Sequence, residues 1–404
     1  MKQSVVVIGH GSTSRLGVVR SIAETGCHIT VIVMAGRKRD GKTLNTRKPF
    51  DCYSKYVNRV LFCPALDGEY LIKLLLAECI IENQKVILIP DNDFTAAIID
   101  NNKLLLEKFF LFPHVIHEPK SFLFWMNKEN QKELANKLGL NVPNSKRILF
   151  ENGHYVIPEG INYPCFIKTV TSIYGGKNFF SRCDNKEALR NYLNSISVEK
   201  EIPLMAEDYK EIETEYAALG FSDGKTVALP GIIKFISNSA SHYGIAMSGE
   251  VLSCSWINDL MDKFRKFILE IGFVGLFDID FYYSRNQFYF GELNLRFGGS
   301  GYAITAKGVN LPAMLVRYFQ GDDRLDFDKV IQGPVSSFVN ERICSDDWYK
   351  GMISIRDYRR LINSADISFV RNTEDPDPEK HFKRLHRELA IKLFLKRLIN
   401  HHSN

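Results

Sequence analysis

Short apolar runs alternate with helical patterns along the first part of the chain. Residues 4–9 form an apolar run that ends in a glycine-rich turn, and residues 29–33 form a second run after a helical stretch that closes at Gly26. A third run, residues 86–90, is followed by the polar segment 91–93. Apolar strands separated by amphipathic helices are typical of a parallel sheet whose ligand contacts lie at the carboxyl ends of its strands. The pattern therefore predicts an α/β fold.

A hairpin is predicted over residues 277–296, where aromatic and β-branched residues dominate two runs separated by a polar break. Glu292, Asn294 and Arg296 are two residues apart, so a strand would point all three to one face. In a hairpin, Asp280 can face Glu292 across the ladder. Two carboxylates and an amide form an oxygen-rich site of the kind that suits Mg²⁺, which usually takes one or two carboxylates plus substrate phosphates.

Lysines stand in three segments that are otherwise apolar or helical. Lys168 and Lys234 interrupt strand-like runs, and a buried ammonium needs an anionic partner. Lys128 lies in the first turn of a helical pattern over residues 120–142, where the helix dipole does not favour a cation. Gly175 and Gly176 follow small residues, so their backbone amides can approach phosphate oxygens, although an ordinary hairpin turn is the preferred interpretation of this segment taken alone. The segment is not a Walker A loop.

Composition places the chain among soluble globular proteins. Its 404 residues are enough for two or three domains, with 45% hydrophobic and 25% charged residues. A formal net charge of +5 indicates no dedicated nucleic-acid binder but suits anionic ligands such as nucleotides. The eight cysteines show no C-x-x-C spacing, so we expect buried reduced thiols. With no signal-peptide pattern and no membrane-spanning run, a cytoplasmic location is expected.

Three other patterns leave alternatives open. Gly9, Gly11 and Gly17 do not meet the dinucleotide fingerprint, which disfavours an NAD-dependent dehydrogenase. The basic segment 36–48 is either a solvated loop or a site for an acidic substrate or partner. The basic C-terminal helix over residues 379–400 either docks on its own domain or binds a membrane surface or a partner, and docking is the preferred interpretation.

The chain resembles the ATP-grasp superfamily, which includes biotin carboxylase, D-alanine–D-alanine ligase and many carboxylate–amine ligases. Biotin carboxylase-like members carry an acidic residue and, twelve residues later, the start of an E-x-N-x-R run. Asp280 and the run from Glu292 to Arg296 match this pattern in type and spacing, with Asp in place of the usual Glu. The resemblance implies that Asp280, Glu292 and Asn294 bind Mg²⁺, or Mn²⁺ in its place. It also implies that Arg296 steadies the reacting acyl or phosphoryl group.

The nucleotide motifs of the superfamily follow in the same order. Lys128 matches the D-K motif, although Asn127 stands where Asp is usual, and Lys168 matches the strand lysine that contacts the phosphates. Residues 171–176 resemble the glycine-rich lid, with fewer glycines than in many members. A hinge that binds adenine and a ribose-binding acid complete the set. The implied ATP-binding residues are Lys128, Lys168, Gly175, Gly176, Glu207, Asp208, Tyr209 and Glu215.

The resemblance also implies a domain plan: an N-terminal Rossmann-like domain over residues 1–120, an ATP-grasp domain over 121–325 and a C-terminal α/β extension over 326–404. The ATP-grasp domain would comprise a small lid subdomain at about 145–205 and a larger antiparallel-sheet subdomain.

The closest match within the superfamily is to carboxylate–amine ligases similar to D-aspartate ligase. These enzymes activate a carboxylate with ATP and join it to an amine, so the expected substrates are amino acids or peptides. Arg296 and Lys234 are the candidates for the γ-phosphate and the oxyanion. His10 and residues 91–93 are candidates for the acceptor end. A non-catalytic ATP-binding sensor or assembly protein is the alternative, and a homodimer is compatible with either function.

Overall fold

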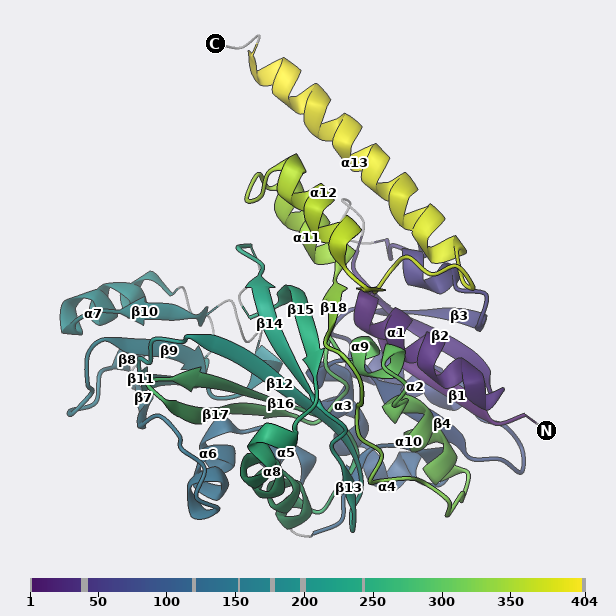
Figure 1. Cartoon of the computed structure of the whole chain (residues 1–404), viewed down its shortest axis with the longest axis horizontal. Helices are drawn as coiled ribbons and strands as arrows, with labels where there is room; N and C mark the ends of the chain where they lie inside the picture. The colour runs from purple at the N-terminus through teal and green to yellow at the C-terminus, as the bar shows by residue number, and fades with distance from the viewer. Residues whose placement is uncertain are drawn as a thin grey trace.

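The computed structural model describes residues 2–37, 43–117, 121–151, 153–174, 179–196, 201–241 and 244–401, with side chains in the C-terminal helix described through Leu389. Three sheets make up the fold (Figure 1). The predicted α/β class is confirmed. The two lysine-flanking glycines Gly175 and Gly176 lie outside the described residues.

The N-terminal sheet is parallel, with the strand order β3-β2-β1-β4-β5. Its three predicted strands are confirmed as β1, β2 and β4, whereas β3 and the helix that follows it were not predicted. The order reverses between β1 and β4, which is where ligands bind in open α/β sheets. The elements of this part are β1 (Ser4–Gly9), α1 (Thr13–Ile22), η1 (Ala23–Thr25), β2 (His28–Ala35), η2 (Phe50–Tyr53), β3 (Val57–Pro64), α2 (Gly68–Glu78), β4 (Val86–Pro90), α3 (Asp93–Asn101), α4 (Lys103–Leu106) and β5 (Phe110–Leu111).

A second, five-stranded sheet has the order β10-β9-β11-β7-β8 and lies at one end of the molecule, at the left in Figure 1. The helical pattern that leads to it is broken into two helices, and the second begins at Lys128 because Asn127 caps its N-terminus. The elements are β6 (His114–Val115), α5 (Phe122–Trp125), α6 (Lys128–Lys137), β7 (Ser145–Glu151), β8 (His154–Val156), β9 (Cys165–Thr169), η3 (Ser172–Tyr174), β10 (Ser181–Cys183), α7 (Lys186–Ser195) and β11 (Leu204–Asp208).

The central sheet has nine strands, with β17-β16-β12-β14-β15-β18-β19 in order and β13 and β6 beside β12 and β16. The predicted hairpin is β16 and β17, and its turn residues Arg285 and Asn286 have φ angles of 47° and 63°. The elements are β12 (Thr214–Asp223), β13 (Val227–Ala228), β14 (Ile232–Asn238), β15 (Ala246–Leu252), η5 (Ser255–Ile257), α8 (Asn258–Ile271), β16 (Phe273–Ser284), β17 (Gln287–Asn294), α9 (Tyr302–Ala306) and α10 (Leu311–Phe319).

The segment after residue 326 continues the central sheet, because β18 pairs with β15 and β19 pairs with β18. It comprises β18 (Ser336–Val339), α11 (Glu341–Tyr349), α12 (Ile355–Ser364), β19 (Ile367–Ser368) and α13 (Asp377–His401). The helix α13 extends away from the body of the molecule (Figure 1).

The same C-terminal segment is tied to the N-terminal sheet by buried polar contacts. Asp375 accepts hydrogen bonds from Arg20 Nε and Ser54 Oγ, both at 2.9 Å, and Thr13 Oγ1 donates to Asn340 Oδ1 at 3.2 Å. Arg20 and Asp375 are both almost fully buried, so each depends on the other for its charge compensation. These contacts hold the parallel sheet against the central sheet.

Among the described helices, none is both long and apolar enough to cross a membrane. All eight cysteines are free thiols, and seven of them are buried.

Candidate active site

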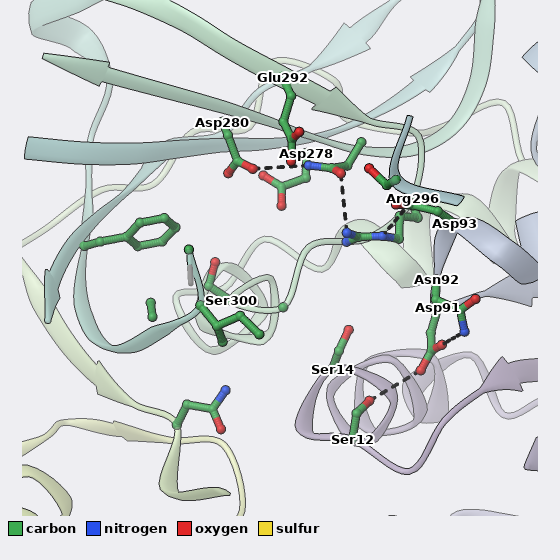
Figure 2. Close-up of a pocket in the computed structure, with 18 of the residues that line it drawn as sticks. Ser12, Ser14, Asp91, Asn92, Asp93, Asp278, Asp280, Glu292, Arg296 and Ser300 are labelled. Atoms are coloured by element: carbon green, nitrogen blue, oxygen red, sulfur yellow. Dashed lines mark hydrogen bonds and ion pairs between the residues drawn. The ribbon is translucent and has the colours of Figure 1, made fainter. Parts of the chain in front are cut away.

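The hairpin β16–β17 places its acidic residues as the alternation of the sequence predicted. Asp280 lies directly opposite Glu292 in the ladder, and Asp278 lies opposite Asn294. Asn294 Nδ2 donates to Asp280 Oδ2 at 3.2 Å. All four side chains line one cavity of about 650 Å³ (Figure 2). The carboxylates and the amide are therefore gathered at one place on the sheet.

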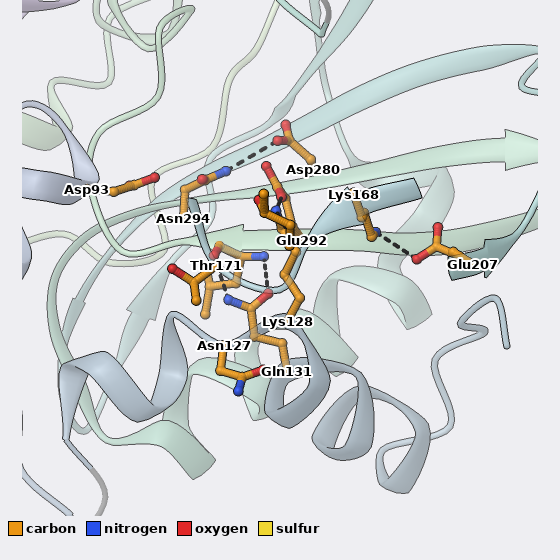
Figure 3. A network of polar contacts seen from close by, with 12 residues as sticks. Asp93, Asn127, Lys128, Gln131, Lys168, Thr171, Glu207, Asp280, Glu292 and Asn294 are labelled. Carbon is orange, nitrogen blue, oxygen red and sulfur yellow. Dashed lines mark hydrogen bonds and ion pairs between the residues drawn. The ribbon is translucent and has the colours of Figure 1, made fainter. Parts of the chain in front are cut away.

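The edge strand β17 is fixed by a side chain that the sequence analysis did not select. Gln131 on α6 is buried, and its Nε2 donates to Leu293 O at 2.8 Å while its Oε1 accepts from Leu293 N at 2.9 Å. Its Nε2 also donates to Trp125 O at 2.7 Å. The amide thus replaces a neighbouring strand at Leu293, the residue between Glu292 and Asn294 (Figure 3).

The two predicted phosphate-binding lysines are buried and paired with carboxylates of the same region (Figure 3). Lys128 Nζ lies 3.0 Å from Glu292 Oε2, and Lys168 Nζ lies 2.7 Å from Glu207 Oε2. A third lysine, Lys132, also donates to Glu207 Oε2 and was not predicted. Burial opposes the charge on Glu207, but the ammonium groups of Lys168 and Lys132 outweigh it and lower the pKa of this carboxyl.

The pKa of Lys132 is lowered as well, but in a lysine a lower pKa disfavours the charged form. Burial, together with the like charge of Lys168, lowers the pKa of Lys132 from 10.5 to about 8, although Glu207 acts against both effects. The Glu207 carboxylate therefore pairs with two ammonium groups, and the charged form of Lys132 is destabilised by burial and by the nearby charge of Lys168. The sequence did hold a signal for Gln131 and Lys132. Residues three and four apart lie side by side on a helix, so positions 128, 131, 132 and 135 share the face that carries Lys128.

A second cavity, of about 340 Å³, adjoins the first and shares Asp280, Glu292, Phe180, Phe235 and Gly244 with it. The predicted nucleoside residues line it together with aromatic side chains. Its lining includes Lys168, Glu207, Asp208, Tyr209, Glu215, Phe166, Ile212 and Tyr282.

Polar contacts hold two of the acids in this second cavity. Glu215 Oε2 accepts from Asn238 Nδ2, and Asp208 accepts from Asn144 and Asn162 at 3.1 Å each. An apolar slot with polar groups at its rim is suited to a planar ring that carries a sugar.

Arg296 connects the hairpin to the N-terminal sheet. Its Nε donates to Asp93 Oδ1 at 2.9 Å and its Nη2 donates to Asn294 Oδ1 at 3.4 Å (Figure 2). Burial opposes its charge, but Asp93, Asp278 and the carboxylates of the hairpin raise its pKa. The guanidinium is therefore fixed in its charged form at the junction of the two sheets.

The N-terminal sheet closes the other end of the larger cavity at its strand-order reversal. His10, Ser12 and Asp91 line the cavity, with Ser12 Oγ donating to Asp91 Oδ2 at 3.4 Å. Burial raises the pKa of Asp91. His10 Nδ1 lies 2.8 Å from Met34 O, so the ring is oriented by a backbone carbonyl of β2. Both predicted acceptor-end segments thus reach the cavity, from the carboxyl ends of β1 and β4.

Lys234, predicted to contact the γ-phosphate or the oxyanion, lies on β14 and faces a carboxylate of the next strand. Its Nζ lies 3.8 Å from Glu250 Oε2, and among the residues that the structure describes it lines neither cavity. Its neighbour Phe235 lines both cavities, and successive side chains of a strand point to opposite faces. The apolar run around Lys234 reflects a sheet with one half-exposed face, not a buried ligand site.

The oxygen-rich set fits a hard cation that arrives with a substrate. In the described part of the chain, no group of three His, Cys, Asp or Glu side chains is placed to hold a metal ion. Asp280, Glu292 and Asn294 offer two carboxylates and one amide oxygen, and Mg²⁺ commonly completes such a set with phosphate oxygens and water. The donor set suits Mg²⁺ bound together with a nucleotide better than a permanently bound metal.

Residues 133–312 match the family model described as the ATP-grasp domain. The large chain of carbamoyl phosphate synthase from Buchnera aphidicola is 25% identical over 233 residues, which cover 56% of this chain and 21% of that protein. The corresponding chain from Vibrio cholerae is 23% identical over 217 residues, 52% of this chain and 20% of that protein. The chain therefore spans about a fifth of the length of these curated relatives.

Solved structures share the fold over most of the chain. An L-amino acid ligase from Bacillus licheniformis has a TM-score of 0.61 at 14% identity and covers 83% of this chain and 79% of its own. A biotin carboxylase from Campylobacter jejuni has a TM-score of 0.61 at 15% identity, and the match covers 83% of this chain and 74% of that one. N5-carboxyaminoimidazole synthetase from Staphylococcus aureus, complexed with ADP, has a TM-score of 0.58 at 15% identity, and the match covers 83% of this chain and 82% of that one.

Proposed function

Because residues 133–312 form an ATP-grasp domain, we propose that the protein is an ATP-dependent ligase that joins a carboxylate to an amine through an acylphosphate. The observation that carries this proposal is the joined pair of cavities. One cavity has the aromatic lining and acids suited to a nucleoside, and the other has the carboxylates, the arginine and a second group of polar residues. A nucleotide whose nucleoside occupies the smaller cavity would direct its phosphates toward the shared residues Asp280 and Glu292.

The nucleotide would lie with its adenine and ribose against the segment 207–209 and Glu215. Lys128 and Lys168 then donate to its phosphates, since both ammonium groups lie at carboxylates of the cavity walls. Asp280, Glu292 and Asn294 would hold Mg²⁺, which neutralises phosphate charge when bound. Catalysis is then mostly positioning and charge neutralisation, as in other phosphoryl transfers.

The reaction has two steps. An oxygen of the substrate carboxylate attacks the γ-phosphorus and the bond to the β-phosphate oxygen breaks, which gives an acylphosphate and ADP. The amine nitrogen then attacks the acyl carbon, phosphate leaves with the electron pair of the C–O bond, and the amine loses a proton. Arg296, fixed by Asp93, donates to the oxyanion that forms on the acyl group. The residues at the carboxyl ends of β1 and β4 line the acceptor end.

The relatives give the substrate panel for the test. The Bacillus licheniformis structure is named an L-amino acid ligase, and other similar proteins are carboxylases or a carbamoyl phosphate synthase chain. The panel therefore combines single amino acids, dipeptides and bicarbonate as carboxylates, each with and without an amine.

The test is ADP release from ATP, compared between the wild type, Glu292→Gln and the control Glu250→Ala. Glu250 lies on β15 outside both cavities, so its loss should leave the rate unchanged. We expect release that depends on both the carboxylate and the amine, and at least a roughly 100-fold lower rate in Glu292→Gln. Tight nucleotide binding without turnover on any member of the panel would instead assign the protein to the ATP-binding sensors.

A further inference from the structure

Glu207 is shared by two lysines that stand on different elements, Lys132 on α6 and Lys168 on β9. Its Oε2 accepts from Lys168 Nζ at 2.7 Å and from Lys132 Nζ, and all three side chains are at most 10% exposed. A single buried carboxylate needs only one ammonium for charge balance, so the second one requires an explanation.

The two ammonium groups differ in what they can reach. Lys168 lines the nucleoside cavity, whereas Lys132 lines neither cavity among the residues that the structure describes. Lys132 Nζ donates as well to Pro143 O at 3.3 Å, in the segment between α6 and β7. Lys168 can therefore turn from Glu207 toward a bound phosphate, while Lys132 is held inside the protein.

We propose that Lys132 is a positioning residue that keeps Glu207 paired when Lys168 turns to the phosphates of a nucleoside di- or triphosphate. The inference rests on the proposed function, because it requires a nucleotide in the cavity. Without Lys132, the turn of Lys168 toward a phosphate would leave the buried Glu207 carboxylate without a cation. The free-energy cost of that unpaired charge would then weaken nucleotide binding. With Lys132, Lys168 exchanges one anionic partner for another and Glu207 remains compensated.

The ion pair between Lys128 and Glu292 would undergo the same exchange of partners, but a different cation would take the place of the lysine. When Lys128 turns to a phosphate, Glu292 lies where Mg²⁺ bound with the nucleotide would compensate it. Glu207 is not a member of the oxygen-rich set, and among the described residues its printed ion pairs are with Lys168 and Lys132, so Lys132 is the cation that remains.

The test compares binding of ADP and of adenosine by calorimetry in Mg²⁺ buffer. The variants are Lys132→Met, Lys132→Arg and the control Lys137→Met, which removes an exposed lysine from the same helix. We expect Lys132→Met to bind ADP roughly 10- to 100-fold more weakly, since a charged hydrogen bond is lost in the bound state. Adenosine binding should stay within about twofold of the wild type because adenosine has no phosphates. Lys132→Arg should restore ADP binding.

A double-mutant cycle identifies Glu207 as the reason for the effect. In a Glu207→Gln background no carboxylate remains to be compensated, so adding Lys132→Met should weaken ADP binding by less than about threefold. Equal loss in both backgrounds would overturn the inference, as would unchanged ADP affinity in Lys132→Met. Urea unfolding is measured on the same samples. A Lys132→Gln variant is added to this unfolding measurement, and failure of both Lys132→Met and Lys132→Gln to fold would assign Lys132 to the fold and also overturn the inference.

These outcomes are separate from failure of the proposed function. The wild type must bind ADP for the comparison to be made, and a wild type that binds no adenine nucleotide refutes both. A wild type that binds ADP but forms no amide leaves the Lys132 comparison fully decisive.

Discussion

Replacing Gln131 with leucine should loosen the edge of the central sheet at the run from Glu292 to Arg296. The amide makes three hydrogen bonds to the backbone, two of them to the N–H and C=O of Leu293. Leucine has a similar volume but leaves these three backbone groups without their partner.

The expected size of the effect follows from these contacts. A buried polar group left unpaired costs about 1–3 kcal/mol, and burying a leucine side chain returns about 1.5–3 kcal/mol. For three groups, the midpoints of these ranges give a net loss in the free energy of unfolding of about 4 kcal/mol. Because Leu293 stands between Glu292 and Asn294, the affinity for ADP in Mg²⁺ buffer should fall as well.

Urea unfolding monitored by fluorescence measures the first effect, and calorimetric titration with ADP measures the second. The matched control is Asn130→Leu on the neighbouring position of α6, where one hydrogen bond to Phe124 O is lost at the surface, for about 0.5–1 kcal/mol. A Gln131→Leu variant that unfolds at the same urea concentration as Asn130→Leu and binds ADP like the wild type would refute the role given to this amide.

Two further predictions concern charge and backbone space. Lys132 has a pKa of about 8 in the folded chain against an ordinary value of 10.5, so between these pH values the unfolded chain holds more protons and stability should rise with pH. In urea unfolding between pH 8 and pH 10.5, the wild type should gain up to about 3 kcal/mol of unfolding free energy relative to Lys132→Met. A difference between the two proteins that does not change with pH would contradict the shifted pKa. A Cβ at Gly9 would lie 1.6 Å from Asp91 Oδ1, so Gly9→Ala should lose about 1–3 kcal/mol. Adding Asp91→Ala should recover part of that loss in thermal unfolding, whereas strictly additive losses would show that the clash is relieved in another way.

Alternation and spacing along the hairpin were sufficient to predict the core of the site. A side-chain period of two residues fixes Glu292 and Asn294 on one face, and pairing in a tight hairpin sets Asp280 opposite Glu292. Both relations involve residues that are close together in the sequence, so they can be predicted from a single sequence. The apolar face and the terminal Gly272 of α8 are local signals of the same kind.

Gln131 and Lys132 escaped prediction because their partners are distant. Gln131 bonds to a residue 162 positions away, and Lys132 to one 75 positions away, so the sequence of α6 alone shows only polar residues on a helix. The position of Lys234 could not be predicted for a related reason. A lysine within an apolar strand can face a cavity or a half-exposed sheet surface, and only the register against Glu250 and the direction of Phe235 decide between them.

The buried ion pair between Arg20 and Asp375 has a consequence for how the protein is made. The two residues are 355 positions apart, so a ribosome that adds about 5–20 residues per second needs roughly 20–70 s to supply the carboxylate after the guanidinium. During that interval the N-terminal sheet has its strands but not the group that compensates Arg20. The junction of the sheets, and with it the acceptor end of the site, can close only when translation has passed residue 375.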